Sequence, residues 1–161
     1  MSTRSMTPVE IAALLEHAVV GHLGLINNGQ PYIIPLHFLY MNSKIYLHSK
    51  KNCLKIDILC RNDNVCFEVE ELLGIRTAVT PCKYTSNYRS IIASGTARFV
   101  DHSEKKLTIM NEFAKKYSKG TSFDNIPLSA IGKIEVIEIT VCVITGKVSE
   151  TECNIIDNSV L

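Results

Sequence analysis

Residues 19–48, VVGHLGLINNGQPYIIPLHFLYMNSKIYLH, decide the fold of this chain. They contain three runs rich in β-branched and aromatic residues, which predicts strands over 19–26, 32–40 and 45–48. Asn28-Gly29 supplies the positive φ angles of a tight hairpin turn, and the Met-Asn-Ser triplet at 41–43 predicts a second turn. We therefore expect three consecutive antiparallel strands in a meander.

Further strands are predicted downstream. Residues 65–69 and 134–148 have the β-branched pattern of strands. A strand is also predicted over 89–100, where Gly95 would allow a bulge or bend that helps the sheet close. Residues 70–87 have no clean period and are predicted to form a long, partly irregular connection.

Three helices are predicted around these strands. Thr7-Pro8-Val9-Glu10 has the pattern of a capping box, which predicts a helix to about His17. Residues 51–61 are predicted to be helical because their apolar residues share one face. Ser103 is predicted to cap a third helix that ends near 117–120. Its expected buried stripe is Leu107, Met110, Phe113 and Ala114, and the residues expected largely off it are Lys105, Lys106, Lys115 and Lys116.

About six antiparallel strands with inserted helices favour an α+β fold, mainly antiparallel β and barrel-like, over a doubly wound sheet. The 161 residues fit a single domain, 1–161. The chain contains neither the G-x-G-x-x-G dinucleotide fingerprint nor the phosphate-binding loop of nucleotide triphosphatases.

The charge balance argues against two classes of partner. Lys and Arg total 17 against 16 Asp and Glu, so the chain lacks the electrostatic footprint of a protein that binds duplex DNA or an anionic membrane. No stretch approaches the roughly 18 apolar residues of a membrane span, and no secretory signal is expected. The six cysteines form no Cys-x-x-Cys pair, which favours a reducing cytoplasm and gives no metal-ligand spacing.

The most informative stretch for chemistry is residues 45–55, IYLHSKKNCLK, where a strand end meets a helix start. Hydrogen-bond donors gather there at positions 48, 49, 50, 51 and 55, which are His48, Ser49, Lys50, Lys51 and Lys55, and a helix N-terminus adds unpaired N–H groups. This combination is typical of a seat for a terminal phosphate. An ordinary solvated basic turn explains the pattern equally well.

Two other stretches are candidates for a ligand site. Tyr88-Arg89-Ser90 opens a strand, and Arg89 has the planar fork that binds phosphate or a carbonyl, although a surface charge is the commoner role. Residues 31–40 carry two prolines, which favour a strand edge able to hydrogen-bond a flat heterocycle. His37 and Phe38 would then face the ring, and a simple outward-facing polar role for His37 remains the alternative.

Taken in order, these stretches resemble the FMN-binding split-barrel proteins related to pyridoxamine 5'-phosphate oxidase, and within them the nitroimidazole-resistance (Nim) family. The resemblance runs from about Ile11 to Lys147. The matching pieces are GHLG at 21–24, PYIIPL at 31–36 with Phe38 and Tyr40, IYLHS at 45–49 with Lys55, VCFEV at 65–69, Cys82 with YRS at 88–90, Gly95, EKK at 104–106 and TGK at 145–147.

The resemblance implies a split β-barrel that binds FMN at the interface of a homodimer, with parts of each site supplied by the partner. His48, Ser49 and Lys55 would hold the phosphate and ribityl end. The backbone from Leu36 to Phe38 would border the isoalloxazine, next to His37 as a substrate-side or proton-donating group. The remaining implied cofactor-binding residues are Pro35, Lys51, Cys53, Tyr88, Arg89 and Ser90.

The sequence departs from the family pattern at the proposed phosphate seat. Cys53 stands where the family usually has a turn glycine, Leu54 where many members have arginine, and Lys50 where a small residue is usual. Loss of arginine at 54 would weaken the grip on phosphate, and Lys50 or Lys51 would restore the charge.

Three hypotheses follow. The first is a cytoplasmic FMN-dependent oxidoreductase that passes electrons from a reduced donor to a small acceptor such as a nitro-aromatic compound. The second is a non-catalytic dimeric module that binds flavin or haem, with His37 or His48 as the axial ligand. The third is a dimeric scaffold with a degenerate pocket, which the residues at 53 and 54 favour.

Overall fold

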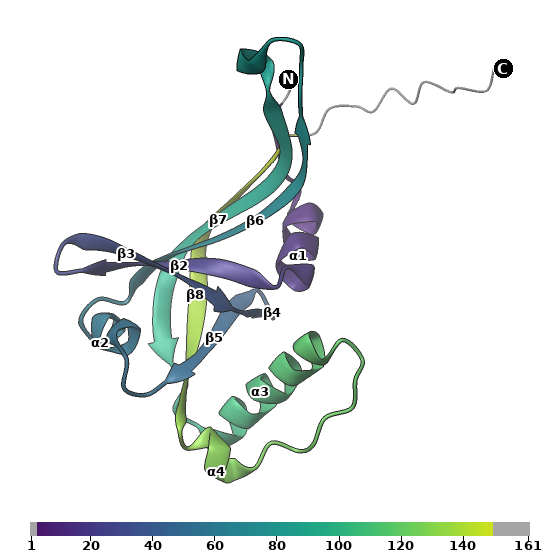
Figure 1. The fold of residues 1–161 in the computed structure, drawn as a ribbon. Helices are drawn as coiled ribbons and strands as arrows, with labels where there is room; N and C mark the ends of the chain where they lie inside the picture. The colour runs from purple at the N-terminus through teal and green to yellow at the C-terminus, as the bar shows by residue number, and fades with distance from the viewer. Residues whose placement is uncertain (1–2, 150–161) are drawn as a thin grey trace.

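A computed structural model describes residues 3–149 and shows one strongly curved antiparallel sheet with helices around it (Figure 1). The described strands are β1 (Thr3–Ser5), β2 (Val20–Asn27), β3 (Gln30–His37), β4 (Leu39–Met41), β5 (Lys44–Lys50), β6 (Asn64–Arg76), β7 (Thr85–Phe99) and β8 (Ile134–Ser149). The helices are α1 (Pro8–His17), α2 (Leu54–Arg61), α3 (Ser103–Ser118) and α4 (Leu128–Ile131), with a 3₁₀ turn, η1 (Pro81–Lys83).

The two ends of the sheet meet at a single residue. The strand order is β3-β2-β6-β7-β8-β5-β4, and β1 pairs with β8. Because only Phe38 separates the end of β3 from the start of β4, the first and last strands of this path adjoin. The sheet therefore curls into a barrel that is open at one seam, which confirms the predicted α+β split-barrel class.

The predicted meander over 19–48 is wrong. The two turns form as expected, with positive φ at Asn28, Gly29, Asn42 and Ser43. However, the strand expected over 32–40 breaks at Phe38, so β3 pairs with β2 while β4 pairs with β5 at the opposite end of the sheet. Pro31 and Pro35 lie on β3, which stands at one end of the strand order and pairs with β2, in agreement with the expectation of an edge strand.

The long connection predicted over 70–87 is largely strand. β6 continues to Arg76 and β7 begins at Thr85, so only residues 77–84 join them. The two strands stay paired along this length, with one register shift between Leu72 and Gly74. The resulting hairpin arm projects well beyond the barrel (Figure 1). Continuous cross-strand pairing explains why mixed polarity here does not indicate a loop.

The bulge predicted at Gly95 is confirmed. The pairing of β7 with β8 shifts register between Ser94 and Gly95. A Cβ atom at Gly95 would lie 2.1 Å from the carbonyl oxygen of Thr140, so the bend needs a residue without a side chain.

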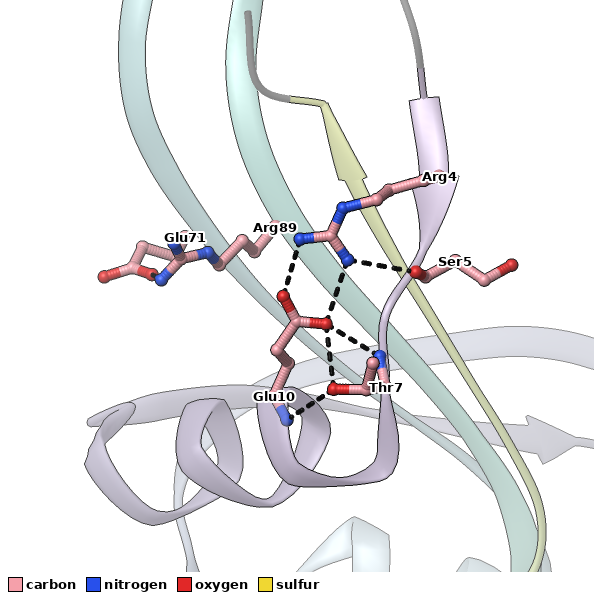
Figure 2. Close-up of polar contacts among 6 residues, drawn as sticks. All are labelled: Arg4, Ser5, Thr7, Glu10, Glu71 and Arg89. Carbon is pink, nitrogen blue, oxygen red and sulfur yellow. Dashed lines mark hydrogen bonds and ion pairs between the residues drawn. The ribbon is translucent and has the colours of Figure 1, made fainter. Parts of the chain in front are cut away.

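The capping box of α1 forms as predicted (Figure 2). The Glu10 N–H donates to the Thr7 hydroxyl, and the Thr7 N–H donates to the Glu10 carboxylate at 2.7 Å. The Arg4 guanidinium adds a two-pronged contact to Glu10 at 2.6 and 2.9 Å, and it acts with the Thr7 N–H to lower the pKa of this carboxyl to about 2. Helix α1 is thereby fixed at its first turn.

Two other helix predictions need correction. Helix α2 begins at Leu54 rather than at residue 51, because residues 51–53 form the turn out of β5. Helix α3 begins at Ser103 with His102 as its N-cap, and no side chain caps it.

The buried stripe of α3 also differs from the prediction. Phe113 is buried as expected, but Leu107, Met110 and Ala114 are only half-buried. Ile109 and Lys106 are buried instead, and the Lys106 ammonium lies 3.0 Å from Glu135. An ion pair with β8 thus allows a lysine on the packed face.

The main core fills the barrel interior, with Leu23, Phe38, Leu47 and Phe67 almost fully buried. A second cluster lies between α3 and the sheet, where Ile109 and Phe113 pack with Tyr46 and Val136. Phe38, at the seam, stacks edge-on against Phe67 with ring centroids 5.1 Å apart.

Candidate functional site

The corner between β5 and α2 brings polar groups together around the Cys53 sulfur. The Ser49 hydroxyl oxygen lies 3.1 Å from the sulfur, and the Lys55 ammonium donates to it at 3.4 Å. The thiol lies 3.3 Å from the carbonyl oxygen of Lys50. The fold thus brings Ser49 and Lys55 together at the strand-to-helix corner, and Lys51 lies exposed in the turn beside them.

The surroundings of Cys53 favour its thiolate. Burial raises the pKa of the thiol, but hydrogen bonds from Ser49, the Ile56 N–H and Lys55 outweigh burial and lower it overall. Cys53 is the N-cap of α2; its side chain makes no capping hydrogen bond, and the Ile56 N–H donates to its carbonyl oxygen at 2.9 Å. The corner consequently stabilises negative charge where the helix begins.

His48 lies half-buried on β5 next to this corner. Its ring packs edge-on against Phe113 of α3, with centroids 4.9 Å apart, and its Nδ1 atom is buried without a hydrogen-bond partner. Burial lowers the pKa of His48, and the neighbouring His37 and Lys55 lower it further. The ring is therefore neutral near pH 7, and we assign its proton to Nε2 because a buried N–H without an acceptor would cost more than a bare lone pair.

His37 reaches the same face of α3 from the end of β3. Its ring stacks on Tyr117 with centroids 4.6 Å apart, and Tyr117 in turn stacks on Phe113 at 6.0 Å. The two imidazoles thus flank an aromatic pair on α3. The sequence named both histidines as candidates, and the fold brings them to one place.

The backbone of Phe38 is engaged by α3 at the seam. The Tyr117 hydroxyl accepts from the Phe38 N–H at 2.9 Å and lies within donating distance of the Phe38 and Val19 carbonyl oxygens, at 2.7 and 2.9 Å. The predicted free edge for a heterocycle is therefore occupied at Phe38. Pro35 is exposed and Leu36 half-buried on β3, so the stretch before the seam is the part that stays accessible.

Sequence reasoning missed two residues at the seam, Tyr117 and Lys116. Its ammonium donates to the Phe38 carbonyl at 3.1 Å and lies 4.1 Å from the centre of the Phe38 ring. Burial lowers the pKa of Lys116 to about 8. For Tyr117 the sequence offered one signal: its i, i+4 spacing from Phe113 places both rings on one side of the helix.

Tyr88, Arg89 and Ser90 lie far from this corner within the chain. They sit on the hairpin arm, where Arg89 pairs with Val148 of β8, whereas His48 pairs with Val136. Twelve residues of strand at about 3.3 Å each separate the two positions, a path of about 40 Å. Arg89 lies beside Glu71, with 3.6 Å between charged atoms (Figure 2). One chain alone does not unite this group with the corner.

Comparison with known proteins identifies the family. The family model described as "Pyridoxamine 5'-phosphate oxidase" matches residues 7–148. The chain belongs to this family. None of the curated proteins compared with the sequence matches it significantly.

Three solved structures show how widely the fold is used. A protein from Bacteroides thetaiotaomicron, whose proposed role is 5-nitroimidazole antibiotic resistance, is 27% identical, with a TM-score of 0.78 over 91% of this chain and 87% of that one. The flavocytochrome Anf3 from Azotobacter vinelandii is 19% identical, with a TM-score of 0.81 over 92% and 70%. A FAD and heme binding protein from Mycobacterium smegmatis is 15% identical, with a TM-score of 0.84 over 94% and 75%. The last two likenesses establish the fold only.

Residues 3–149 contain neither a cluster of metal-ligating side chains nor a helix suited to span a membrane. No group of three or more His, Cys, Asp or Glu side chains in this range is arranged to hold a metal ion. None of the helices described there has the length and apolar character that crossing a bilayer requires.

Proposed function

We propose that this member of the pyridoxamine 5'-phosphate oxidase family is a flavoprotein that binds FMN at the corner between β5 and α2. The observation that carries the proposal is the meeting of the Ser49 hydroxyl and the Lys55 ammonium at the Cys53 sulfur, at the residue where α2 begins. A set of hydroxyl, ammonium and helix N-terminal donors fits a phosphate dianion.

The neighbouring residues suit the rest of the cofactor. His48 offers a neutral N–H beside the corner, and the accessible stretch Pro35–His37 leads from the seam along the edge of β3. His37 is the candidate group on the substrate side, because it is exposed and backed by Tyr117. Bound FMN would supply the redox chemistry, and the protein would fix its orientation and exclude water.

We further propose that the working unit is a homodimer. Val20, Ile33, Ile92 and Val143 are large apolar residues, each at least 41% exposed, on β2, β3, β7 and β8. Leu72 and Ile75 on the hairpin arm are 63% and 71% exposed. Exposed apolar surface of this extent favours association of two chains. A second chain would also allow Tyr88, Arg89 and Ser90 to reach the corner of its partner.

The first test is the ligand that co-purifies with the protein, identified by absorbance and mass. The proposal expects oxidised-flavin absorbance and the mass of FMN at one per chain, and a colourless protein that ignores added FMN refutes it. Lys55→Met is expected to weaken FMN binding at least tenfold, while Lys119→Met, at the exposed C-terminal end of α3, serves as the control. Reduction of a nitro-aromatic acceptor by the reduced holoprotein tests the oxidoreductase role.

Sharing of sites between chains is tested by mixing two variants. Homodimers of Lys55→Met and of Arg89→Ala each lack one part of every site. If sites are shared, the mixed dimer regains one intact site, built from the normal corner of one chain and the normal arm of the other. If each site lies within one chain, mixing restores no binding.

Haem is a second candidate ligand, favoured by the orphaned Nδ1 of His48 and the nearby ring of His37. Haem titration would then give a Soret shift that His48→Ala or His37→Ala abolishes. A Soret shift that persists in both variants would show that neither histidine is the axial ligand.

A further inference from the structure

The donors assigned to the phosphate in the proposed site already have an acceptor in the protein itself. The Lys55 ammonium donates to the sulfur of Cys53, and the Ser49 hydroxyl oxygen lies 3.1 Å from the same sulfur. A protonated sulfur is a weaker acceptor than a phosphate oxygen, but it accepts from the Lys55 ammonium here and so engages a donor that a phosphate would need. The Cys53 sulfur and a ligand phosphate would therefore compete for the same donors.

We propose that Cys53 is a specificity-determining residue that competes with the ligand: its sulfur occupies the anion seat, and a phosphorylated ligand binds only by taking over the donors that the sulfur holds. The inference rests on the proposed function, because it concerns the same corner. It reverses the sequence-based assignment of Cys53 as a residue that helps to bind the cofactor.

The geometry supports competition rather than shared binding. The two side-chain donors lie within 3.4 Å of the sulfur, the Lys55 ammonium at 3.4 Å and the Ser49 oxygen at 3.1 Å. An anion placed at the same donors would lie against the sulfur, so the sulfur must move before the anion can make both contacts. Two further contacts fix the position of Cys53: its thiol lies against the Lys50 carbonyl, and its side chain packs on the main core.

The consequence is that the site selects ligands by the strength of their anionic group. A ligand whose anionic group is strong enough to displace the sulfur gains Ser49 and Lys55 as partners, whereas a neutral ligand leaves the sulfur in place. The residue at 53 therefore sets how strongly the site prefers FMN over riboflavin, which has the same ring system but no phosphate. Removal of the sulfur is expected to raise affinity for FMN by about tenfold, the size of one charge-assisted hydrogen bond, and to leave riboflavin affinity unchanged.

The test compares FMN and riboflavin binding to the full chain and to Cys53→Ala, Cys53→Gly and Cys53→Ser. Competition predicts that the ratio of FMN to riboflavin affinity rises in Cys53→Ala and Cys53→Gly and rises less in Cys53→Ser, whose hydroxyl keeps a neutral acceptor. Cys60→Ala, at an exposed position of the same helix, is the matched control and should leave the ratio unchanged. A ratio that stays constant or falls in Cys53→Ala overturns the inference while FMN binding itself stands.

A second readout follows the thiol directly. The rate at which iodoacetamide alkylates Cys53, measured by mass on its peptide, should fall when FMN is bound but not when riboflavin is bound, with Cys60 as the internal reference. Equal protection by both ligands means that the ring covers Cys53 and overturns the competition. If neither ligand binds the natural chain or any variant, the proposed function fails and the inference fails with it.

Discussion

Replacing Tyr117 with phenylalanine tests how the barrel seam is held. The substitution removes one hydroxyl and leaves the stacking on His37 and Phe113 in place. The hydroxyl is the acceptor for the Phe38 N–H at 2.9 Å, and Phe38 is 0% exposed. The Phe38 carbonyl keeps the Lys116 ammonium at 3.1 Å. The net loss is therefore one buried N–H without a partner.

A buried donor left unpaired costs about 1–3 kcal/mol, so we expect Tyr117→Phe to lower the free energy of unfolding by about 2 kcal/mol. For a chain of this size that corresponds to a fall in Tm of about 4–8 °C. Urea unfolding gives the free energy, and amide hydrogen exchange should show faster exchange at Phe38. Tyr84→Phe removes a hydroxyl from a tyrosine that is 51% exposed and serves as the control.

The reasoning would be refuted if Tyr117→Phe and Tyr84→Phe both stayed within about 0.5 kcal/mol of the natural chain, the range typical of neutral surface changes. Unchanged exchange at the Phe38 amide would lead to the same conclusion. In either case the seam would be closed by packing, and the hydroxyl would have no structural role.

Three further predictions concern charge and backbone. Because burial lowers the pKa of Lys116 to about 8 from 10.5, the unfolded chain binds more protons between these values, so stability should rise with pH over that window. Lys116→Met should remove this rise in unfolding measurements at pH 7.5 and 10, and an identical rise in the variant contradicts the assignment. Glu138 contacts Lys44 and Lys105, which outweigh burial and lower its pKa to about 2. Its contribution is present above about pH 4.5 and lost as pH falls through 2, so Glu138→Gln should cost about 1–2 kcal/mol at pH 7 and flatten the acid dependence; equal acid sensitivity in both chains argues against it. Gly95→Ala should cost about 3 kcal/mol, since the new Cβ would meet the Thr140 carbonyl at 2.1 Å, and a stability loss below about 1 kcal/mol would mean that the bulge relaxes.

Local signals in the sequence predicted local structure well. The capping box at Thr7 and Glu10, the turns at Asn28-Gly29 and 42–43, and the bulge at Gly95 all depend on neighbouring residues, and all are present. The meander failed because the choice of strand partners depends on contacts far apart along the chain. Nothing within residues 32–40 shows that Phe38 ends one strand and starts another at the opposite end of the sheet.

The candidate site likewise contains one part that follows from local sequence and one part that depends on tertiary contacts. Ser49, Cys53 and Lys55 are close in sequence, and their meeting at a corner follows from a strand end and a helix start. Tyr117 and Lys116 reach the seam from a helix 78 residues or more beyond Phe38, so their role depends on tertiary docking. The separation of Arg89 from the corner follows from the length of β8, which the sequence predicted without showing its consequence.

Titration of the purified, ligand-free protein with FMN, followed by flavin fluorescence, tests the central claim most directly. The account predicts saturable binding of one FMN per chain, weakened at least tenfold in Lys55→Met and unaffected in Lys119→Met. Binding that is absent, or that is equally strong in Lys55→Met, would contradict the placement of a phosphate at the corner between β5 and α2.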